Sequence, residues 1–346
     1  MGNNNDSLNR RGDAKTDILI VGGGVGGCAA AMAATSLGKR VIITEETDWL
    51  GGQLTSQAVP PDEHSWIEQF GRTQRYADYR RLVRKYYRDN YPLTHNARRN
   101  RFLNPGNGFV SRLCHEFRVG VAVIDQMLAS ARSTGLLETR FKRKALSVQT
   151  EGDRVVAVTL NNSELGIQEI IEAGYVLDAT ELGDLLPMAG VEYVSGFESQ
   201  AETGEPNAPT GPAQPDNVQA FSWVFAIGYD PEYEHVIQKP SQYDRWKNYV
   251  PETNPPWPFP LFSWDRPIHS GTSSFGPYAT RSSKIEVEKR SLFDDETDEP
   301  QQSWFNWRRI TYPGHFDDPR YQRQIASVIW TQNDYMGGNI IDKPED

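Results

Sequence analysis

Apolar and polar positions alternate near the start of the chain in a way that predicts a βαβ unit. The apolar run 17–21 leads into a glycine cluster, and an alanine-rich helical run over 28–37 follows it. Residues 39–44 then predict a second strand, with Glu45 at its end. A strand, a glycine turn, a helix and a second strand form the unit on which dinucleotide-binding domains are built.

Further along, hydrophobic spacing predicts two helices. Over 72–91 the apolar side chains recur at helical intervals, so we expect an amphipathic helix packed over the core, with its arginines on a solvated face. The residues of the apolar face are Tyr76, Tyr79, Leu82, Val83, Tyr86 and Tyr87. An apolar helix is expected over 119–132, ending near Gly135.

The stretch 136–180 predicts strands instead. Residues 148–150 and 154–160 are rich in β-branched side chains and flank the turn 151–153, which indicates a hairpin. Residues 174–180 predict another, buried strand that runs into Glu181 and Gly183. The sequence therefore favours an α/β fold with both parallel and antiparallel strands.

The glycine cluster fits G-x-G-x-x-G through Gly22, Gly24 and Gly27. The first glycine permits the tight turn, the second lets backbone approach a pyrophosphate, and the third lets the helix pack on the strand. Free N–H groups of the first helical turn, beginning near Val25, would face the phosphates. Glu45 lies at about the spacing expected for the acid that accepts hydrogen bonds from ribose hydroxyls. A purely structural βαβ turn is the alternative.

Composition narrows the classes of function. The chain has 346 residues, 38% of them hydrophobic, and a net charge of −10, which argues against nucleic acid as a partner. No apolar run approaches the ~20 residues that span a bilayer. The two cysteines, Cys28 and Cys114, form no C-x-x-C pair, so we expect a reducing, cytoplasmic compartment, with Cys28 as a small core residue.

The resemblance to a known family rests on three further segments. These are the segment 48–57 around Gly51 and Gly52, the segment 110–116 around His115, and the segment 178–186. They resemble the FAD-dependent oxidoreductases of the glutathione-reductase-like superfamily, in particular the group often labelled xanthan-lyase-like. The resemblance spans about residues 17–340 and also includes 203–206, 217–221 and 332–335.

That resemblance implies FAD as cofactor and a Rossmann-like FAD-binding domain with a second, loop-rich α+β substrate lobe. It implies that the Gly-Gly pair passes the pyrophosphate and ribityl end of FAD, and that the strand ending near 179–184 returns to the cofactor. The expected cofactor-binding residues are Gly22, Gly24, Val25, Gly27, Glu45, Gly51, Gly52, Gln53, Ala179, Gly183 and Asp184.

We expect four regions along the chain. They are a disordered tail at 1–16, an FAD-binding domain from 17–61 and 119–194, a helical insertion at 62–118, and an aromatic-rich substrate or cap lobe at 195–346. Residues 195–217 are expected to form an ordered lip near the active site. The family closes its FAD site with a late strand, glycine turn and helix that are missing before Asp346, so the C-terminal lobe is expected to be incomplete.

The function expected is hydride transfer between bound flavin and a small organic substrate. The alternatives are a non-catalytic Rossmann-like remnant with a defective flavin site, and an NAD-only dehydrogenase. His115 and His64 are the candidate acid–base residues, since an imidazole that titrates near neutrality can relay a proton. A structural histidine, hydrogen-bonded in a core or at a helix start, is the alternative for each. No cluster has metal-ligand spacing, and the sequence does not predict the oligomeric state.

Overall fold

The computed structural model describes residues 13–253, 256–269, 285–293 and 303–341. The chain divides into two compact units, each described here by itself. The first unit comprises residues up to Gly106, Ser111–Tyr193 and Gly314–Tyr321. The second comprises Asn107–Val110, Val194–Pro313 and the residues from Gln322 onward.

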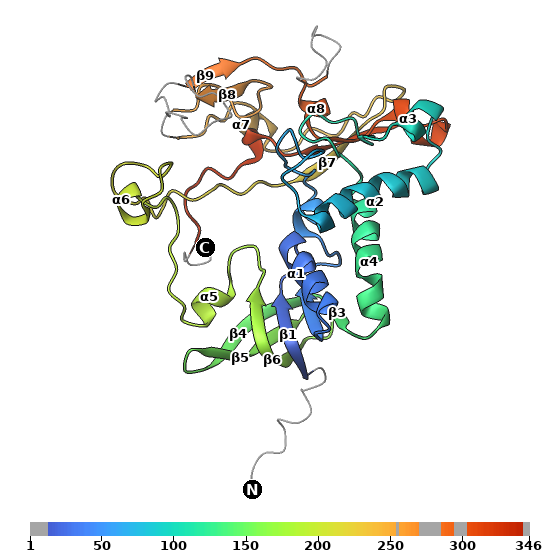
Figure 1. Cartoon of the computed structure of the whole chain (residues 1–346). Coiled ribbons are helices and arrows are strands. Elements are labelled where there is room, and N and C mark those ends of the chain that lie inside the picture. Colours follow the sequence, from blue (N-terminus) through green and yellow to red (C-terminus); the bar gives the residue numbers. More distant parts are fainter. Residues whose placement is uncertain (1–12, 254–255, 270–284, 294–302, 342–346) are drawn as a thin grey trace. The chain divides into compact units, whose positions relative to one another are not determined.

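A six-stranded sheet forms the base of the first unit (Figure 1). Its spatial order is β3-β2-β1-β6-β5-β4, in which β3, β2, β1 and β6 are parallel and β5 and β4 continue antiparallel. The strands are β1 (Ala14–Val21), β2 (Val41–Glu45), β3 (Leu137–Phe141), β4 (Arg143–Glu151), β5 (Arg154–Asn162) and β6 (Ile167–Asp178). The predicted combination of a parallel sheet with an antiparallel hairpin is confirmed.

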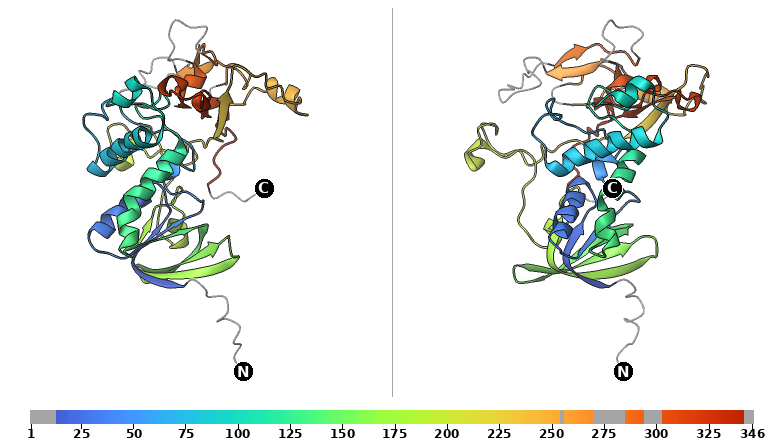
Figure 2. Two further views of the ribbon diagram at one scale, coloured as in Figure 1. Left: turned by 90° about the vertical axis from the view of Figure 1, so that its right-hand side faces the viewer. Right: turned by 45° about the vertical axis from the view of Figure 1, so that its right-hand side comes forward.

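Helices cover one face of this sheet, as both views of Figure 2 show for α1 and α4. The helices of the unit are α1 (Val25–Ser36), α2 (Gln74–Asn90), α3 (His95–Arg99), α4 (Phe117–Ser133) and α5 (Leu185–Met188). The apolar side chains of α1 to α4 join Ile20 and Ile43 of the sheet in one buried cluster, to which α2 contributes Tyr79, Val83 and Tyr87. Leu185 of α5 belongs instead to a second buried cluster of the sheet. Cys28 of α1 is buried in this cluster, as predicted.

A distant segment of the chain completes this core. Residues 314–321 return to the first unit, where the Thr94 and Asp317 N–H groups donate to the carbonyls of His315 and Pro92, each at 2.9 Å. Phe316 is buried in the same cluster as Tyr87 and stacks on Tyr321, with ring centroids 5.1 Å apart. The dinucleotide-type unit therefore depends on residues far beyond its last strand.

The expectation of a disordered tail over 1–16 is wrong at its end. The strand β1 begins at Ala14, which pairs with Ile171 of β6, and Asp13 accepts a hydrogen bond from the Ile170 N–H at 2.9 Å. Polar Lys15 and Thr16 thus belong to the sheet because β6 supplies backbone partners for them. Residues 1–12 lie outside the described part of the chain.

The helix predicted over 72–91 is α2, but its arginines are not all on a solvated face. Arg80 and Arg84 are 1% and 5% exposed, because they form ion pairs with Glu63 and Glu68 from the segment preceding the helix. The periodicity located the helix correctly. It could not show that acidic partners from the preceding segment neutralise two of the charges and allow them to be buried.

The strand predicted over 174–180 is the end of β6, which stops at Asp178, and it is not buried throughout. Ile171 and Ala173 are buried, whereas Tyr175 is 74% exposed. The second half of the strand pairs with β1 through its backbone, and its side chains Val176 and Leu177 are only partly buried against the two core clusters. Apolar composition was a poor guide to burial here.

The second unit is loop-rich and contains two small sheets. Strands β7 (Phe225–Tyr229), β10 (Arg309–Thr311) and β11 (Gln324–Val328) form an antiparallel sheet, and β8 (Arg266–His269) pairs with β9 (Ile285–Glu288). Its short helices are α6 (Gln200–Thr203), α7 (Tyr243–Lys247) and α8 (Trp304–Trp307). Trp304 and Phe305 are buried, whereas Trp223 is 77% exposed, so the aromatics serve both as core and as surface.

Candidate functional site

The loop between β1 and α1 has the geometry that its glycines predict. Gly22 has a φ of +105°, and a Cβ there would overlap the Ala179 carbonyl oxygen. A Cβ on Gly27 would overlap the Gly22 carbonyl oxygen, so this glycine lets α1 pack closely on the strand end. Gly24 differs, because it has ordinary extended backbone and a Cβ would meet only the Glu181 Oε1 atom, at 3.2 Å. The space beside Gly24 is open, as a phosphate-binding turn requires.

Helix α1 begins at this opening. Gly24 is its N-cap residue and supplies no side chain to the first turn, so the N–H groups at Val25 and beyond have no side-chain cap. The Cys28 N–H makes the first intrahelical bond, to the Gly24 carbonyl at 2.9 Å. An anion beside Gly24 would therefore meet unpaired backbone donors and the positive end of the helix dipole.

Glu45 lies at the carboxyl end of β2, next to the glycine loop. Its Oε2 accepts a hydrogen bond from the Gly23 N–H at 3.0 Å, and its Oε1 accepts one from the Thr47 N–H at 2.8 Å. A carboxylate has about four lone-pair positions, so two remain for other donors. The side chain is 9% exposed, and it is thus fixed in place by backbone while retaining acceptor capacity for ribose hydroxyls.

The second glycine pair is joined directly to the first loop. The Gly51 N–H donates to the Gly23 carbonyl at 2.8 Å, and Gly51 and Gly52 both have positive φ, at +111° and +46°. A Cβ on Gly52 would lie 3.0 Å from the Gly24 Cα atom. The two glycine loops therefore approach each other backbone to backbone. Gln53 follows in the short 3-10 turn Gly52–Leu54 and is exposed.

The segment after β6 supplies a third wall. The Ala179 N–H donates to the Val21 carbonyl at 2.8 Å, which places this turn beside Gly22. Asp178 organises the turn by accepting hydrogen bonds from the N–H groups of Thr180 and Leu185, at 3.0 and 2.9 Å. Gly183 has a φ of +72°, and Asp184 donates its N–H to the Thr180 hydroxyl at 2.8 Å.

The strand directions explain why these segments meet. β1, β2 and β6 are parallel, so their carboxyl ends lie along one edge of the sheet, which is where open α/β sheets bind ligands. The cofactor residues expected from sequence come from these three ends and from the Gly-Gly turn. A cofactor with a diphosphate and a ribose fits this arrangement, because a Cβ would fill the space at Gly24 and Gly52.

Glu181 is a residue of this site that the sequence did not identify. Its Oε1 atom would lie 3.2 Å from a Cβ on Gly24 and 3.1 Å from one on Gly52, so its carboxylate stands between the two glycine loops. The side chain is exposed and has room to move away. The sequence signal that could have identified it was its position directly after Asp178, Ala179 and Thr180, in the segment expected to return to the cofactor.

His115 does not have the environment of a neutral-pH acid–base residue. It is 1% exposed, its Nε2 lies 2.9 Å from the Tyr79 hydroxyl, and its Nδ1 lies 2.9 Å from the Glu116 carbonyl oxygen. Burial lowers its pKa to about 4, so the ring is neutral near pH 7. The expectation that it titrates near neutrality is wrong. The geometry agrees with the alternative, a structural histidine just before the start of α4.

His64 is exposed, and its ring stacks on Phe70 with centroids 6.0 Å apart. An acid–base role for it stays a prediction. Among the described residues, no group of three or more His, Cys, Asp or Glu side chains could hold a metal ion. Within the same ranges, no helix is both long enough and apolar enough to cross a bilayer.

Comparison with known proteins agrees with this geometry. The profile of the family described as FAD dependent oxidoreductase matches residues 17–343. A bilirubin reductase of Mediterraneibacter gnavus is 43% identical over 49 residues, which are 14% of this chain and 8% of that protein. The chain therefore spans a small part of this relative.

Solved structures with matching segments have low similarity. A geranylgeranyl bacteriochlorophyll reductase-like protein from Thermoplasma acidophilum has 17% identity and a TM-score of 0.33, covering 52% of this chain and 43% of that one. The glycerol-3-phosphate dehydrogenase from Bacillus halodurans, complexed with FAD, has 14% identity and a TM-score of 0.30, covering 48% and 34%. This chain thus spans less than half of either protein.

The family assignment rests on the profile, which extends over nearly the whole chain and includes every glycine of the two loops. The chain belongs to the family of FAD-dependent oxidoreductases, and FAD is its cofactor.

Proposed function

We propose that this protein transfers a hydride between bound FAD and a small organic substrate. The observation that carries the proposal is the approach of two glycine loops beside the N-terminus of α1, with Glu45 fixed at the neighbouring strand end. When bound, the flavin supplies the redox chemistry, and the protein binds and orients it. The substrate lobe predicted for residues 195–346 remains part of this proposal.

Each group of residues would contact a different part of the cofactor. Backbone N–H groups at Gly24 and Val25 would face the diphosphate, where neither side chain blocks the approach. Glu45 would accept hydrogen bonds from the ribose hydroxyls and would repel a 2′-phosphate. Gly51, Gly52 and Gln53 would continue along the cofactor from the diphosphate toward the ring. Ala179, Gly183 and Asp184 would form the opposite wall.

No acid–base residue is assigned to the reaction. His115 is neutral and enclosed, with both ring nitrogens near partners, so it has no described route by which to exchange a proton. His64 remains the exposed candidate. A hydride transfer whose proton is exchanged with water needs no such residue, and the pH dependence of flavin reduction would distinguish the two cases.

The Glu45→Ala variant tests the cofactor site. Removing the carboxylate should weaken FAD binding, because each hydrogen bond from a ribose hydroxyl to a charged acceptor is worth about 1.5–3 kcal/mol. We expect a lower flavin-to-protein ratio after purification and a higher Kd for FAD, with FMN bound more weakly than FAD in the parent. Glu151→Ala, a change of the same type at the exposed end of β4, is the control.

Glu45 also accepts two backbone hydrogen bonds, so its removal could weaken FAD binding by destabilising the fold. Thermal unfolding of both variants separates that effect from the loss of the ribose contacts. If folded Glu45→Ala protein retains FAD as well as the parent, the ribose assignment is wrong. Anaerobic loss of the yellow colour on mixing with small alcohols, amines or reduced nicotinamide tests hydride transfer itself. A protein that binds FAD but is reduced by none of them would be a scaffold without this activity.

A further inference from the structure

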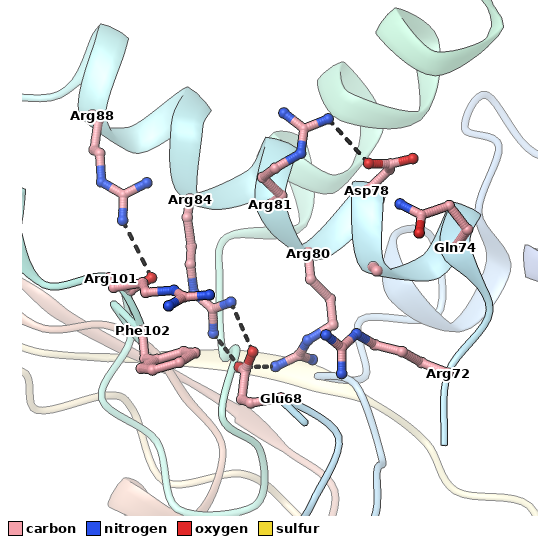
Figure 3. A pocket seen from close by; sticks show the side chains of 11 residues that line it. Glu68, Arg72, Gln74, Asp78, Arg80, Arg81, Arg84, Arg88, Arg101 and Phe102 are labelled. Carbon is pink, nitrogen blue, oxygen red and sulfur yellow. Dashed lines mark hydrogen bonds and ion pairs between the residues drawn. The ribbon is translucent and has the colours of Figure 1, made fainter. Parts of the chain in front are cut away.

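A pocket rich in arginine lies along α2 in the first unit. None of the residues that line it belongs to the FAD site described above. It has a volume of about 310 Å³, and Figure 3 shows the side chains that line it. The charged and aromatic residues that line it are Glu68, Arg72, Asp78, Arg80, Arg81, Arg84, Arg88, Arg101 and Phe102. Its volume is at the lower end of the range for small-molecule pockets.

The inner part of the pocket is rigidly built. Arg80 and Arg84, both buried, point at the carboxylate of Glu68 from α2, as Figure 3 shows. Arg84 also donates its Nε to the Leu103 carbonyl at 2.9 Å, and Arg80 pairs with Glu63. Although burial disfavours its ionised form, hydrogen bonds from Arg84 and Arg80 hold the pKa of Glu68 below its usual range. The floor therefore stays charged and fixed at neutral pH.

One donor of this floor has no partner. The Nε atom of Arg80 is buried and, within the described ranges, makes no hydrogen bond. A buried donor without an acceptor costs free energy, so this atom has a hydrogen bond to give that no described protein group accepts. The side chain that carries it is 1% exposed and lines the pocket.

The rim carries positive charge that carboxylates do not neutralise. Arg81 pairs with Asp78 at 3.1 Å. Arg72 and Arg88 donate to backbone carbonyls, which leaves their charges in place, and Arg101 contacts the Phe102 ring at 5.2 Å. In the part of the chain that the structure describes, none of Arg72, Arg88 and Arg101 forms an ion pair with a carboxylate. Three uncompensated charges thus face one small volume.

This local charge is opposite to that of the whole protein. Residues 62–118 contain twelve Arg and Lys against six Asp and Glu, a formal charge of +6 in a chain of net charge −10. Solubility does not need such a concentration of like charges, and their mutual repulsion costs stability. A ligand of opposite charge would offset that cost.

We propose that this pocket binds a small phosphorylated molecule with at least two negative charges. Guanidinium groups present planar pairs of N–H donors that match phosphate oxygens, and one phosphoryl group supplies a charge near −2 where a carboxylate supplies −1. Arg101 and Arg81 are exposed and can close on the ligand, while Arg80 and Arg84 hold the floor. The acidic lining residues Glu68 and Asp78 repel an anion and so limit its affinity for the pocket.

Inorganic pyrophosphate is the probe for a calorimetric titration of the protein loaded with one equivalent of FAD, so that the glycine loops are occupied by the cofactor. We expect one saturable site per chain, whose affinity falls as ionic strength rises. Arg101→Ala should weaken binding by about tenfold or more, the loss of one charge-assisted hydrogen bond and one charge. Arg101→Lys should recover only part of the lost affinity, because lysine keeps the positive charge but lacks the paired N–H donors of the guanidinium group.

Arg75→Ala is the matched control, since Arg75 lies on α2 beside the pocket, is exposed like Arg101 and does not line the pocket. It should leave pyrophosphate binding unchanged, and succinate, with its charges on separate carboxylates, should bind more weakly than pyrophosphate. The proposal is overturned if the parent binds no pyrophosphate, or if Arg75→Ala weakens binding as much as Arg101→Ala. Arg101-dependent binding to phosphatidylglycerol vesicles without binding of free pyrophosphate would likewise overturn it in favour of a membrane surface.

Discussion

Gly22, Gly24 and Gly26 should respond to substitution in three different ways, and Gly24→Val is the decisive change. Gly24 has φ −62° and ψ −174°, which valine adopts readily, and its Cβ would meet only the movable carboxylate of Glu181. The fold should therefore tolerate the variant. The added methyl groups would occupy the space beside the first turn of α1, where the diphosphate of FAD must approach the backbone.

The expected loss of affinity follows from the contacts that valine would prevent. If two backbone donors can no longer reach the diphosphate, each charge-assisted hydrogen bond is worth about 1.5–3 kcal/mol, so binding should weaken by roughly 3 kcal/mol or more. That corresponds to at least about a hundredfold increase in Kd. The assay is fluorescence titration of the apoprotein with FAD, with thermal unfolding measured on the same sample.

Gly26→Ala and Gly22→Ala are the two controls. A Cβ on Gly26 meets nothing within 4 Å, so alanine should leave FAD affinity unchanged and stabilise α1 by about 0.5–1 kcal/mol. At Gly22 the φ is +105° and a Cβ would overlap the Ala179 carbonyl and lie 2.7 Å from the Thr180 nitrogen, so alanine should lower Tm sharply. A folded Gly24→Val protein that purifies with a full equivalent of FAD would refute the reasoning.

Two further predictions concern charge and pH. Glu181→Gln should tighten FAD binding by about 1 kcal/mol, the order of the repulsion between two like charges in close contact in water. The gain should shrink at high salt, and Glu151→Gln should show none. His115 is held neutral with a pKa of about 4 against 6.5 when unfolded, so below pH 6.5 the unfolded chain binds a proton that the folded one does not. The free energy of unfolding should therefore fall by up to about 3 kcal/mol between pH 6.5 and 4, and urea unfolding of His115→Gln should lack this part of the slope.

Sequence alone was sufficient where a residue's role depends on its immediate neighbours. Gly22 needs a positive φ and Gly27 needs close packing, and both requirements follow from one strand–turn–helix unit. The position of Glu45 follows from the length of that unit. These are local properties, so spacing along the chain contains them.

Other features depended on contacts that spacing does not contain. Arg84 is buried because it forms an ion pair with Glu68, sixteen residues earlier in the chain. Helical periodicity alone predicts that every arginine of α2 is exposed to solvent. The pKa of His115 is lowered mainly by burial, and the charge of Arg80, a residue of α2, lowers it further. Glu181 stands beside Gly24 only because β6 runs next to β1. In each case the deciding neighbour is close in space and distant in sequence.

The return of residues 314–321 to the first unit has a consequence for how this protein is made. A ribosome extends the chain from the amino end, and Phe316, a buried member of the first unit's core, emerges long after the last strand of the sheet. At about 5–20 residues per second, the roughly 130 residues between Tyr193 and Tyr321 take on the order of 6–25 s to synthesise. Throughout that interval Tyr91 and Leu93 lack Phe316, which they contact in the native state. Nascent chains should consequently present this apolar surface to chaperones until residue 321 has left the exit tunnel.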